Sequence, residues 1–337
     1  MRAAVITEPH APLTLVDREV PEPGPGEILV KVVGSGMCFS EINQQRGHYP
    51  GAVYPAIPGH EISGVVAELG PGVTWPAVGT PVGAQFLYDS CGHCDQCARG
   101  DQVVCRRMRI TGVGVDGGYA EYFLARAGYL TPLPADLDPI AAAPLMCAGI
   151  TAFNGLRKAG TRPGAKVAVI GMGGVGELTV RFALAMGARV AVLGRSRRAE
   201  PKARELGAEL FVATAEQDPA EALAAWDGGA DIVVNAAPDS RTAAASIGGL
   251  DTDGTLLLAG SSADPLPLPV PQMLFRRLSV IANPSGSPAD LRDTLAFAVA
   301  ARIVPDVVPV SLDEAPDVLA RMGEGTWSGR AVIDLRR

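Results

Sequence analysis

The fold of the middle of this chain is decided by one stretch, Val167-Ala-Val-Ile170-Gly171-Met-Gly173-Gly174-Val175-Gly176. A short apolar run ends in a G-x-G-x-x-G turn, and a helix-like run over residues 177–186 follows directly. Gly171 permits the tight turn, Gly173 lets the backbone approach a pyrophosphate, and Gly176 allows close packing of helix and strand. A turn without ligand can carry the same glycines, so the surrounding pattern has to decide.

The surrounding pattern alternates short apolar runs with helical segments such as residues 200–206 and 218–226. Such an alternation predicts a parallel sheet covered by helices on both faces, and six strands match the doubly wound dinucleotide-binding fold. The six runs are residues 167–170, 190–193, 210–212, 232–234, 256–258 and 280–282. In this context the free N–H groups at the helix start predict a phosphate site on Gly171, Gly173, Gly174, Val175 and Gly176.

The two ends of the chain differ from the middle. Before residue 145, turn signals alternate with β-rich runs such as residues 28–33, which is typical of an all-β, barrel-like region. After residue 284, a helical pattern leads to a strand expected over residues 329–335. We expect this tail to pack onto the first region, so that residues 1–145 and 285–337 form one domain around a dinucleotide-binding domain of residues 146–284.

The second strand of the middle domain ends in Gly194-Arg195-Ser196-Arg197-Arg198. An NAD site places Asp or Glu here to bind the ribose 2′-hydroxyl. Arginine instead pairs with a 2′-phosphate in bidentate fashion. We therefore predict NADP(H) rather than NAD(H), bound by Gly194, Arg195, Ser196 and Arg197. The alternative is a solvated basic helix start.

Four of the six cysteines stand close together, as Cys91-x2-Cys94-x2-Cys97-x7-Cys105. Disulfides are rare in a reducing cytoplasm, where close-set cysteines are typical metal ligands. Four thiolates form a closed tetrahedral site, so this loop predicts a structural zinc. Reactive surface cysteines are the alternative.

A second metal site would have to be assembled from Cys38, His60 and Cys147. Each has an ordinary alternative, since a lone cysteine is usually a small core residue and a lone histidine a structural one. Together, two cysteines and one histidine are the ligands of a catalytic zinc with an open fourth position. Spacing alone does not show that they converge.

Composition excludes some function classes. Hydrophobic residues make up 47% and charged residues 19%, as in an ordinary globular protein. The net charge is −7 without a basic block, which argues against nucleic acid or an anionic membrane as partner. The N-terminus lacks the features of a signal peptide, and the longest apolar stretch, residues 140–153, is too short to cross a bilayer. We expect a cytoplasmic protein.

Over essentially its whole length the sequence resembles the zinc-containing medium-chain alcohol dehydrogenases. The resemblance implies a GroES-like catalytic domain formed by both ends of the chain, with a Rossmann domain between them. It also implies two Zn²⁺ per chain, the catalytic one on Cys38, His60 and Cys147 with Glu61 close by, and assembly as a dimer or tetramer. The matching residues are Cys38, Gly59-His60-Glu61, the four-cysteine loop, Gly117-Gly-Tyr-Ala-Glu121, Cys147 with Thr151 on the cofactor side, and the glycine turn.

The resemblance assigns roles to the residues around Cys38. Ser40 would hydrogen-bond the substrate oxygen and relay its proton, and Glu41, where the family more often has Asp, would orient His60. Two positions depart from the family. Phe39 replaces a His or Arg that helps to hold the pyrophosphate, and Asn43 replaces a His that ends the proton relay. His48 or water would complete the relay, unless His48 is simply an exposed loop residue.

The leading prediction is an NADPH-dependent reductase of an aldehyde or ketone, which in reverse is an alcohol dehydrogenase. Reduction of a conjugated C=C or C=N bond is a second possibility, because it places less demand on the altered relay. A cofactor-binding relative without catalysis is a third. The retained Cys38, His60, Glu61 and Cys147 argue against it, and against the zinc-free quinone reductases of the superfamily.

Overall fold

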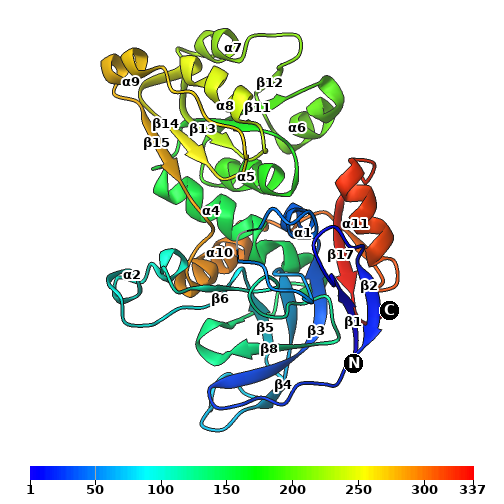
Figure 1. Ribbon diagram of the computed structural model, residues 1–337. Coiled ribbons are helices and arrows are strands. Elements are labelled where there is room, and N and C mark those ends of the chain that lie inside the picture. The colour runs from blue at the N-terminus through cyan, green and yellow to red at the C-terminus, as the bar shows by residue number, and fades with distance from the viewer. Residues whose placement is uncertain (50) are drawn as a thin grey trace. The chain divides into compact units, whose positions relative to one another are not determined.

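The computed structural model describes residues 1–49 and 51–337, and the chain forms two compact units (Figure 1). One unit comprises Met1–Cys147 and Gly286–Arg337, and the other comprises Ala148–Ser285. The predicted boundaries differ by two residues (145 against 147) and one residue (284 against 285). The shift places Cys147 in the same unit as Cys38.

The unit Ala148–Ser285 contains a six-stranded parallel sheet in the order β12-β11-β10-β13-β14-β15. This is the strand order of the doubly wound dinucleotide-binding fold, with β10 in its centre and the crevice expected where the order reverses, between β10 and β13. Val167 pairs with Val190 on one side and with Ile232 on the other, and all three are buried. The strands are β10 (Lys166–Ile170), β11 (Arg189–Gly194), β12 (Leu210–Ala213), β13 (Ala230–Asn235), β14 (Leu250–Leu258) and β15 (Ser279–Ala282).

Two helices in this unit, α7 and α8, begin where a side chain satisfies a free backbone N–H group. Asp218 accepts from the N–H of Glu221, and Asp239 accepts from that of Thr242, as N-cap residues do. The helices are α4 (Ala148–Lys158), α5 (Gly174–Ala185), α6 (Glu200–Leu206), α7 (Pro219–Ala225), α8 (Ser240–Ser246) and α9 (Val270–Arg276). The α/β class predicted from the alternation is confirmed.

The other unit is built on a seven-stranded sheet in the order β16-β17-β3-β4-β5-β9, with β8 also pairing with β3. β17 comes from the end of the chain and pairs antiparallel with β3, so the red strand lies beside the blue one in Figure 1. Two smaller sheets of this unit pair β1 with β2 and β6 with β7. The strands of the unit are β1 (Arg2–Val5), β2 (Thr14–Asp17), β3 (Glu27–Gly36), β4 (Ile62–Leu69), β5 (Pro81–Ala84), β6 (Leu87–Asp89), β7 (Arg109–Ile110), β8 (Tyr122–Arg126), β9 (Thr131–Pro132), β16 (Val307–Val310) and β17 (Arg330–Asp334).

Short helices connect these strands. They are α1 (Phe39–Gln45), α2 (Asp95–Ala98), α3 (Pro139–Ala142), α10 (Pro288–Ala300) and α11 (Ala315–Glu324), with 3₁₀ turns η2 (Ala127–Tyr129) and η3 (Ala143–Met146) among them. Within the described ranges no single helix has the length and apolar character needed to cross a membrane. The segments Pro139–Met146 and Ala148–Lys158 meet that criterion only when they are taken together.

Candidate functional site

Four side chains from distant parts of the sequence meet in the β-rich unit. The ligand atoms of Cys38, His60, Glu61 and Cys147 all lie within 4.8 Å of one another. Cys38 is the N-cap of α1, His60 and Glu61 directly precede β4, and Cys147 directly follows η3. The structure therefore brings together the residues that the sequence could only name separately.

Glycines make room for this cluster. At Gly36 a Cβ atom would lie 1.9 Å from Glu61 Oε2, so any larger residue would displace the carboxylate. Gly59 has φ +98°, a backbone conformation that favours glycine, and a Cβ there would lie 2.4 Å from the ring of Tyr119. The turn before His60 is thus fixed by the Tyr119 ring, which is fully buried.

Glu41 holds two members of the cluster at once. Its Oε1 lies 2.7 Å from His60 Nδ1, and its Oε2 accepts the backbone N–H of Cys38 at 2.7 Å. Glu41 and His60 are only 1% and 2% exposed, so these contacts lie in a region of low dielectric. With Nδ1 facing Glu41, the Nε2 atom of His60 is left as the free nitrogen.

The donor set fits a metal ion. Within residues 1–49 and 51–337, His60 Nε2 and Glu61 Oε2 are buried without a hydrogen-bond partner, which is costly unless something binds them. Two sulfurs, an imidazole nitrogen and a carboxylate oxygen are donors that zinc accepts. Cys38, His60 and Cys147 would hold such an ion, with Glu61 close by.

The electrostatics of the cluster also favour a cation. Burial raises the pKa of Glu61 to about 7, although the guanidinium of Arg330, which forms an ion pair with it, lowers that pKa. A hydrogen bond from Cys147 holds the pKa of Cys38 well below its usual value, and the same bond and burial raise the pKa of Cys147. Burial lowers the pKa of His60, but the charges of Glu41 and Cys38 outweigh it and raise that pKa.

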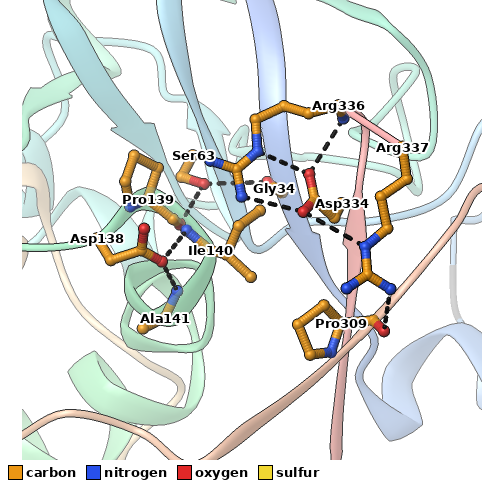
Figure 2. A network of polar contacts seen from close by, with 10 residues as sticks. All are labelled: Gly34, Ser63, Asp138, Pro139, Ile140, Ala141, Pro309, Asp334, Arg336 and Arg337. Carbon is orange, nitrogen blue, oxygen red and sulfur yellow. Dashed lines mark hydrogen bonds and ion pairs between the residues drawn. The ribbon is translucent and has the colours of Figure 1, made fainter.

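A polar network fixes the segment that leads to Cys147 (Figure 2). Ser63 Oγ donates to the carbonyl of Pro139 at 2.6 Å, and Asp138 caps α3 by accepting the N–H groups of Ile140 and Ala141 at 3.0 Å. α3 continues into η3 and then into Cys147. β4 therefore positions both His60, just before it, and the approach to Cys147.

The second cluster lies on one loop. The sulfurs of Cys91, Cys94, Cys97 and Cys105 lie within 4.8 Å of one another, and the separations recorded between pairs are 3.5, 3.8 and 3.9 Å. A disulfide needs about 2 Å between sulfurs, so these are four thiols around one point. The backbone N–H of His93 is the largest cause that lowers the pKa of Cys91 to about 5, while burial and the neighbouring thiols raise that of Cys94 to about 11. The close approach of the four sulfurs suits four thiolates on zinc.

The glycine turn of the other unit has the geometry of a phosphate site. Gly171 has φ +90°, Gly173 is the N-cap of α5, and a Cβ at Gly176 would lie 2.0 Å from the carbonyl oxygen of Gly171. The N–H groups of Gly174, Val175 and Gly176 have no acceptor within the helix and are available to an anion. Thr151 is buried on α4, where its carbonyl accepts from the Asn283 amide at 3.3 Å.

The arginines after β11 divide into two groups. Arg197 already pairs with Glu200 at 2.9 Å and with Glu216 at 3.0 Å. Arg195 and Arg198 are exposed. At Gly194 a Cβ would lie 2.8 Å from the ring of Phe211, so packing explains this glycine without reference to a ligand.

The residues assigned to the proton relay are only partly brought together. Ser40 Oγ lies 3.6 Å from Cys38 Sγ, beside the metal cluster. The His48 side chain is exposed, and its backbone N–H donates to the carbonyl of Asn43 at 2.9 Å. Phe39 is 43% exposed, with the guanidinium of Arg46 5.9 Å from its ring centre.

Sequence reasoning missed three residues at the cluster. Arg330, which is half-buried, pairs with the buried Glu61, and the ring of Phe86 meets His60 edge-on at 5.8 Å. Burial and the nearby charges of Cys147 and Cys38 raise the pKa of Tyr49. None of the three stands in a motif, and none was named as a single residue from the sequence.

Comparison with known proteins agrees with this arrangement. Residues 24–135 match the alcohol dehydrogenase GroES-like domain, and residues 174–300 match the zinc-binding dehydrogenase domain. An alcohol dehydrogenase of Geobacillus stearothermophilus is 34% identical over 100% of this chain and 99% of its own. The NADP-dependent alcohol dehydrogenase C of Mycobacterium bovis is 32% identical over 98% of this chain and 96% of its own.

Solved structures show the same likeness. A cinnamyl alcohol dehydrogenase of Sorghum bicolor superposes with a TM-score of 0.91 at 27% identity, covering 99% of this chain and 97% of its own. Both domain families are matched in order, and the relatives align from end to end. The chain therefore belongs to the zinc-containing medium-chain alcohol dehydrogenases, a family of oxidoreductases that act on alcohols.

Proposed function

We propose that this enzyme depends on zinc and transfers hydride from NADPH to an aldehyde or ketone. In the reverse direction it oxidises the corresponding alcohol with NADP⁺. The observation that carries the proposal is the convergence of Cys38, His60, Glu61 and Cys147, with the buried His60 Nε2 free to bind a metal. Two thiolates and one imidazole leave a tetrahedral ion one open position.

Each side chain around the cluster has its own role in the proposed reaction. When bound, zinc supplies Lewis-acid polarisation of a carbonyl, and NADPH supplies the hydride. Glu41 keeps His60 in the tautomer that presents Nε2, and Arg330 offsets the charge of Glu61. Ser40, whose hydroxyl lies 3.6 Å from the Cys38 sulfur, donates its proton to the substrate oxygen and regains a proton from solvent. Because Asn43 is not a base, water or His48 completes that path.

The preference for NADP(H) is assigned to Arg195, Ser196 and Arg198. Arg197 was part of the sequence prediction, but its pairing with Glu200 and Glu216 leaves its guanidinium engaged. Support for NADP(H) comes from the missing carboxylate after β11 and from the NADP dependence named in the Mycobacterium bovis relative. The glycine turn, from Gly171 to Gly176, and Thr151 would contact the rest of the cofactor.

The test is a fluorescence titration with NADPH and NADH, followed by assays on aldehydes, ketones and enones before and after zinc removal. We expect NADPH to bind at least about tenfold tighter, which corresponds to about 1.4 kcal/mol. Arg195→Ala and Arg198→Ala should weaken NADPH binding and leave NADH binding unchanged. The matched Arg197→Ala should leave the binding of both cofactors unchanged. Equal affinity for both cofactors would overturn the NADP(H) assignment.

The same assay decides between carbonyl and conjugated-bond reduction. Phe39 and Asn43 motivate the alternative, since reduction of a C=C or C=N bond makes a smaller demand on the proton path. Enone reduction that survives zinc removal would favour that alternative and remove the catalytic role of Cys38. Loss of carbonyl reduction together with the metal would support the main proposal.

We also propose a cytoplasmic homodimer or homotetramer. All six cysteines are free, as a reducing compartment requires. Several large apolar side chains on and before α9 are exposed, Phe275 at 84% and Leu274 at 71%, next to the edge strand β15. Exposed apolar surface beside an unpaired strand edge is typical of a subunit contact. Sedimentation of the purified protein tests this assembly.

A further inference from the structure

The four-cysteine cluster contacts two hydroxyl groups that its sequence spacing does not predict. Ser90 Oγ lies 3.1 Å from Cys97 Sγ and 2.7 Å from Tyr129 Oη. Ser90 also donates its backbone N–H to Tyr129 Oη at 3.0 Å. Ser90 directly precedes Cys91, whereas Tyr129 arrives from η2, beyond β8.

The direction of these hydrogen bonds is determined by the donors available. A thiolate only accepts, so the Ser90 hydroxyl donates its proton to Cys97 Sγ. Tyr129 Oη accepts the backbone N–H of Ser90, and its own proton is then free to donate to Ser90 Oγ. The chain of donors runs from Tyr129 through Ser90 to the sulfur, and each bond polarises the next.

Cys97 is a sulfur that benefits from such a donor. It is 8% exposed, so burial has removed most of the water that would otherwise solvate a thiolate. Four thiolates around a divalent cation leave a net negative charge, which donated hydrogen bonds reduce. A backbone N–H, that of Arg107, contacts Cys105 Sγ at 3.4 Å, but only a side-chain donor can be removed by substitution.

We propose that Ser90 and Tyr129 are positioning residues for the structural metal: they fix the Cys97 thiolate and slow the loss of zinc from the four-cysteine loop. This role depends on the structural zinc that the spacing of the four cysteines predicts. Outer hydrogen-bond partners of metal ligands change metal affinity by about 10- to 100-fold when they are removed. Ser90 should have the larger effect, since it touches the sulfur, and Tyr129 the smaller.

The experiment follows alkylation of the purified full-length enzyme in excess chelator, with and without added zinc. Trypsin releases Cys105 on a peptide bounded by Arg99 and Arg106, separate from the peptides of Cys38 and Cys147. Cys105 is the reporter because Ser90 contacts a different sulfur, so its labelling reports metal loss at the loop. The variants are Ser90→Ala, Tyr129→Phe and the conservative Ser90→Thr, with Ser261→Ala and Tyr122→Phe as matched controls.

We expect Cys105 labelling about tenfold faster in Ser90→Ala, a smaller increase in Tyr129→Phe, and wild-type rates in Ser90→Thr and both controls. Labelling of Cys38 should not change. With Co²⁺ in the loop, Ser90→Ala should shift the sulfur-to-metal charge-transfer band to longer wavelength, because the sulfur lone pairs lose a hydrogen bond.

Two results would overturn this role. In the first, Ser90→Ala matches Ser261→Ala in Cys105 labelling. In the second, Cys38 labelling accelerates equally, which would mean general destabilisation. A different failure, wild-type Cys105 labelling that ignores the chelator, would overturn the structural metal site itself and the role of Ser90 with it.

Discussion

The two metal clusters of this chain are built in opposite ways. The four-cysteine cluster uses residues 91–105 of one loop, whereas the other cluster uses Cys38, His60, Glu61 and Cys147, which span 110 positions (38 to 147). The loop cluster consists of four thiols, which are contacted by the Ser90 hydroxyl and by a backbone N–H group. The dispersed cluster depends on buried charges around it, Glu41 on His60 and Arg330 on Glu61.

This difference matches the chemistry expected of each. Four equivalent thiolates saturate a tetrahedral ion and add stability to the fold, whereas two thiolates and an imidazole leave a position for substrate. Placing ligands on separate elements also lets each one be oriented separately by its own partner. Losing a ligand should therefore harm stability at the loop and catalysis at the dispersed cluster.

The largest expected effect tests this difference between the two clusters directly. His60→Gln should lower kcat/KM for carbonyl reduction by roughly a thousandfold, about 4 kcal/mol, because Lewis-acid stabilisation of the developing charge is lost. Cys105→Ser should instead lower the melting temperature and leave kcat of the folded fraction close to wild type. Circular dichroism checks folding, and steady-state kinetics measures activity. If His60→Gln keeps more than a tenth of wild-type activity, the cluster is not catalytic.

A second prediction concerns the buried ion pair of the dispersed cluster. Arg330→Met leaves Glu61 buried without its counter-charge and should lower the free energy of unfolding by about 3 kcal/mol. The double variant with Glu61→Gln should recover much of that loss, since residue 61 then carries no charge that needs a partner. Urea denaturation of the zinc-loaded enzyme measures both.

The control for this experiment is Arg2→Met, which removes an exposed ion pair with Asp313. Such surface pairs add little, so this variant should unfold like wild type. Equal losses in Arg330→Met and Arg2→Met would show that burial of the Glu61–Arg330 pair has no special consequence.

Much of the fold was predictable because local patterns carry it. The strand and glycine turn at residues 167–176 and the helix at residues 200–206 were located within one or two residues. β14 was predicted too short, at residues 256–258 instead of Leu250–Leu258, because its first half contains Asp251 and Asp253, which are polar and lie toward solvent. α9 begins at the end of the Pro-rich residues 264–271, and Pro271 stands in its first turn, where proline is tolerated.

The two metal clusters also differ in how far local sequence predicts them. The loop cluster follows from spacing alone, since its four cysteines are neighbours in sequence. Predicting the dispersed cluster required a family resemblance, and even that resemblance did not predict the role of Arg330. A counter-charge 269 residues away from Glu61 leaves no periodic or spacing signal. The engagement of Arg197 by Glu216 was equally invisible, because it depends on the loop after β12.

A third prediction sharpens the role of Glu41. Glu41→Gln should weaken zinc binding at the dispersed cluster by about 10- to 100-fold, because the amide is a poorer acceptor for the His60 N–H. Glu41→Asp should fall between Gln and wild type, since the shorter side chain cannot hold both His60 and Cys38. Competition with a chelator, read through alkylation of Cys38, measures the affinity. Unchanged retention of metal at Cys38 in Glu41→Gln would refute the positioning role, while the four-cysteine loop serves as the internal control.

The last and smallest effect is a pH dependence of metal binding at the dispersed cluster. Burial lowers the pKa of His60, but the charges of Glu41 and Cys38 raise it above its usual value in the metal-free protein, so zinc competes with a proton for the ring. Affinity should therefore rise as the pH rises, because each proton released on binding is less tightly held at higher pH. Since the charge of Glu41 helps to raise that pKa, Glu41→Gln lowers it, more of the His60 is already neutral, and the slope should flatten. Zinc titrations at several pH values measure the slope. A slope that Glu41→Gln leaves unchanged would mean that protons on Cys147, whose pKa is also raised, dominate the competition with zinc.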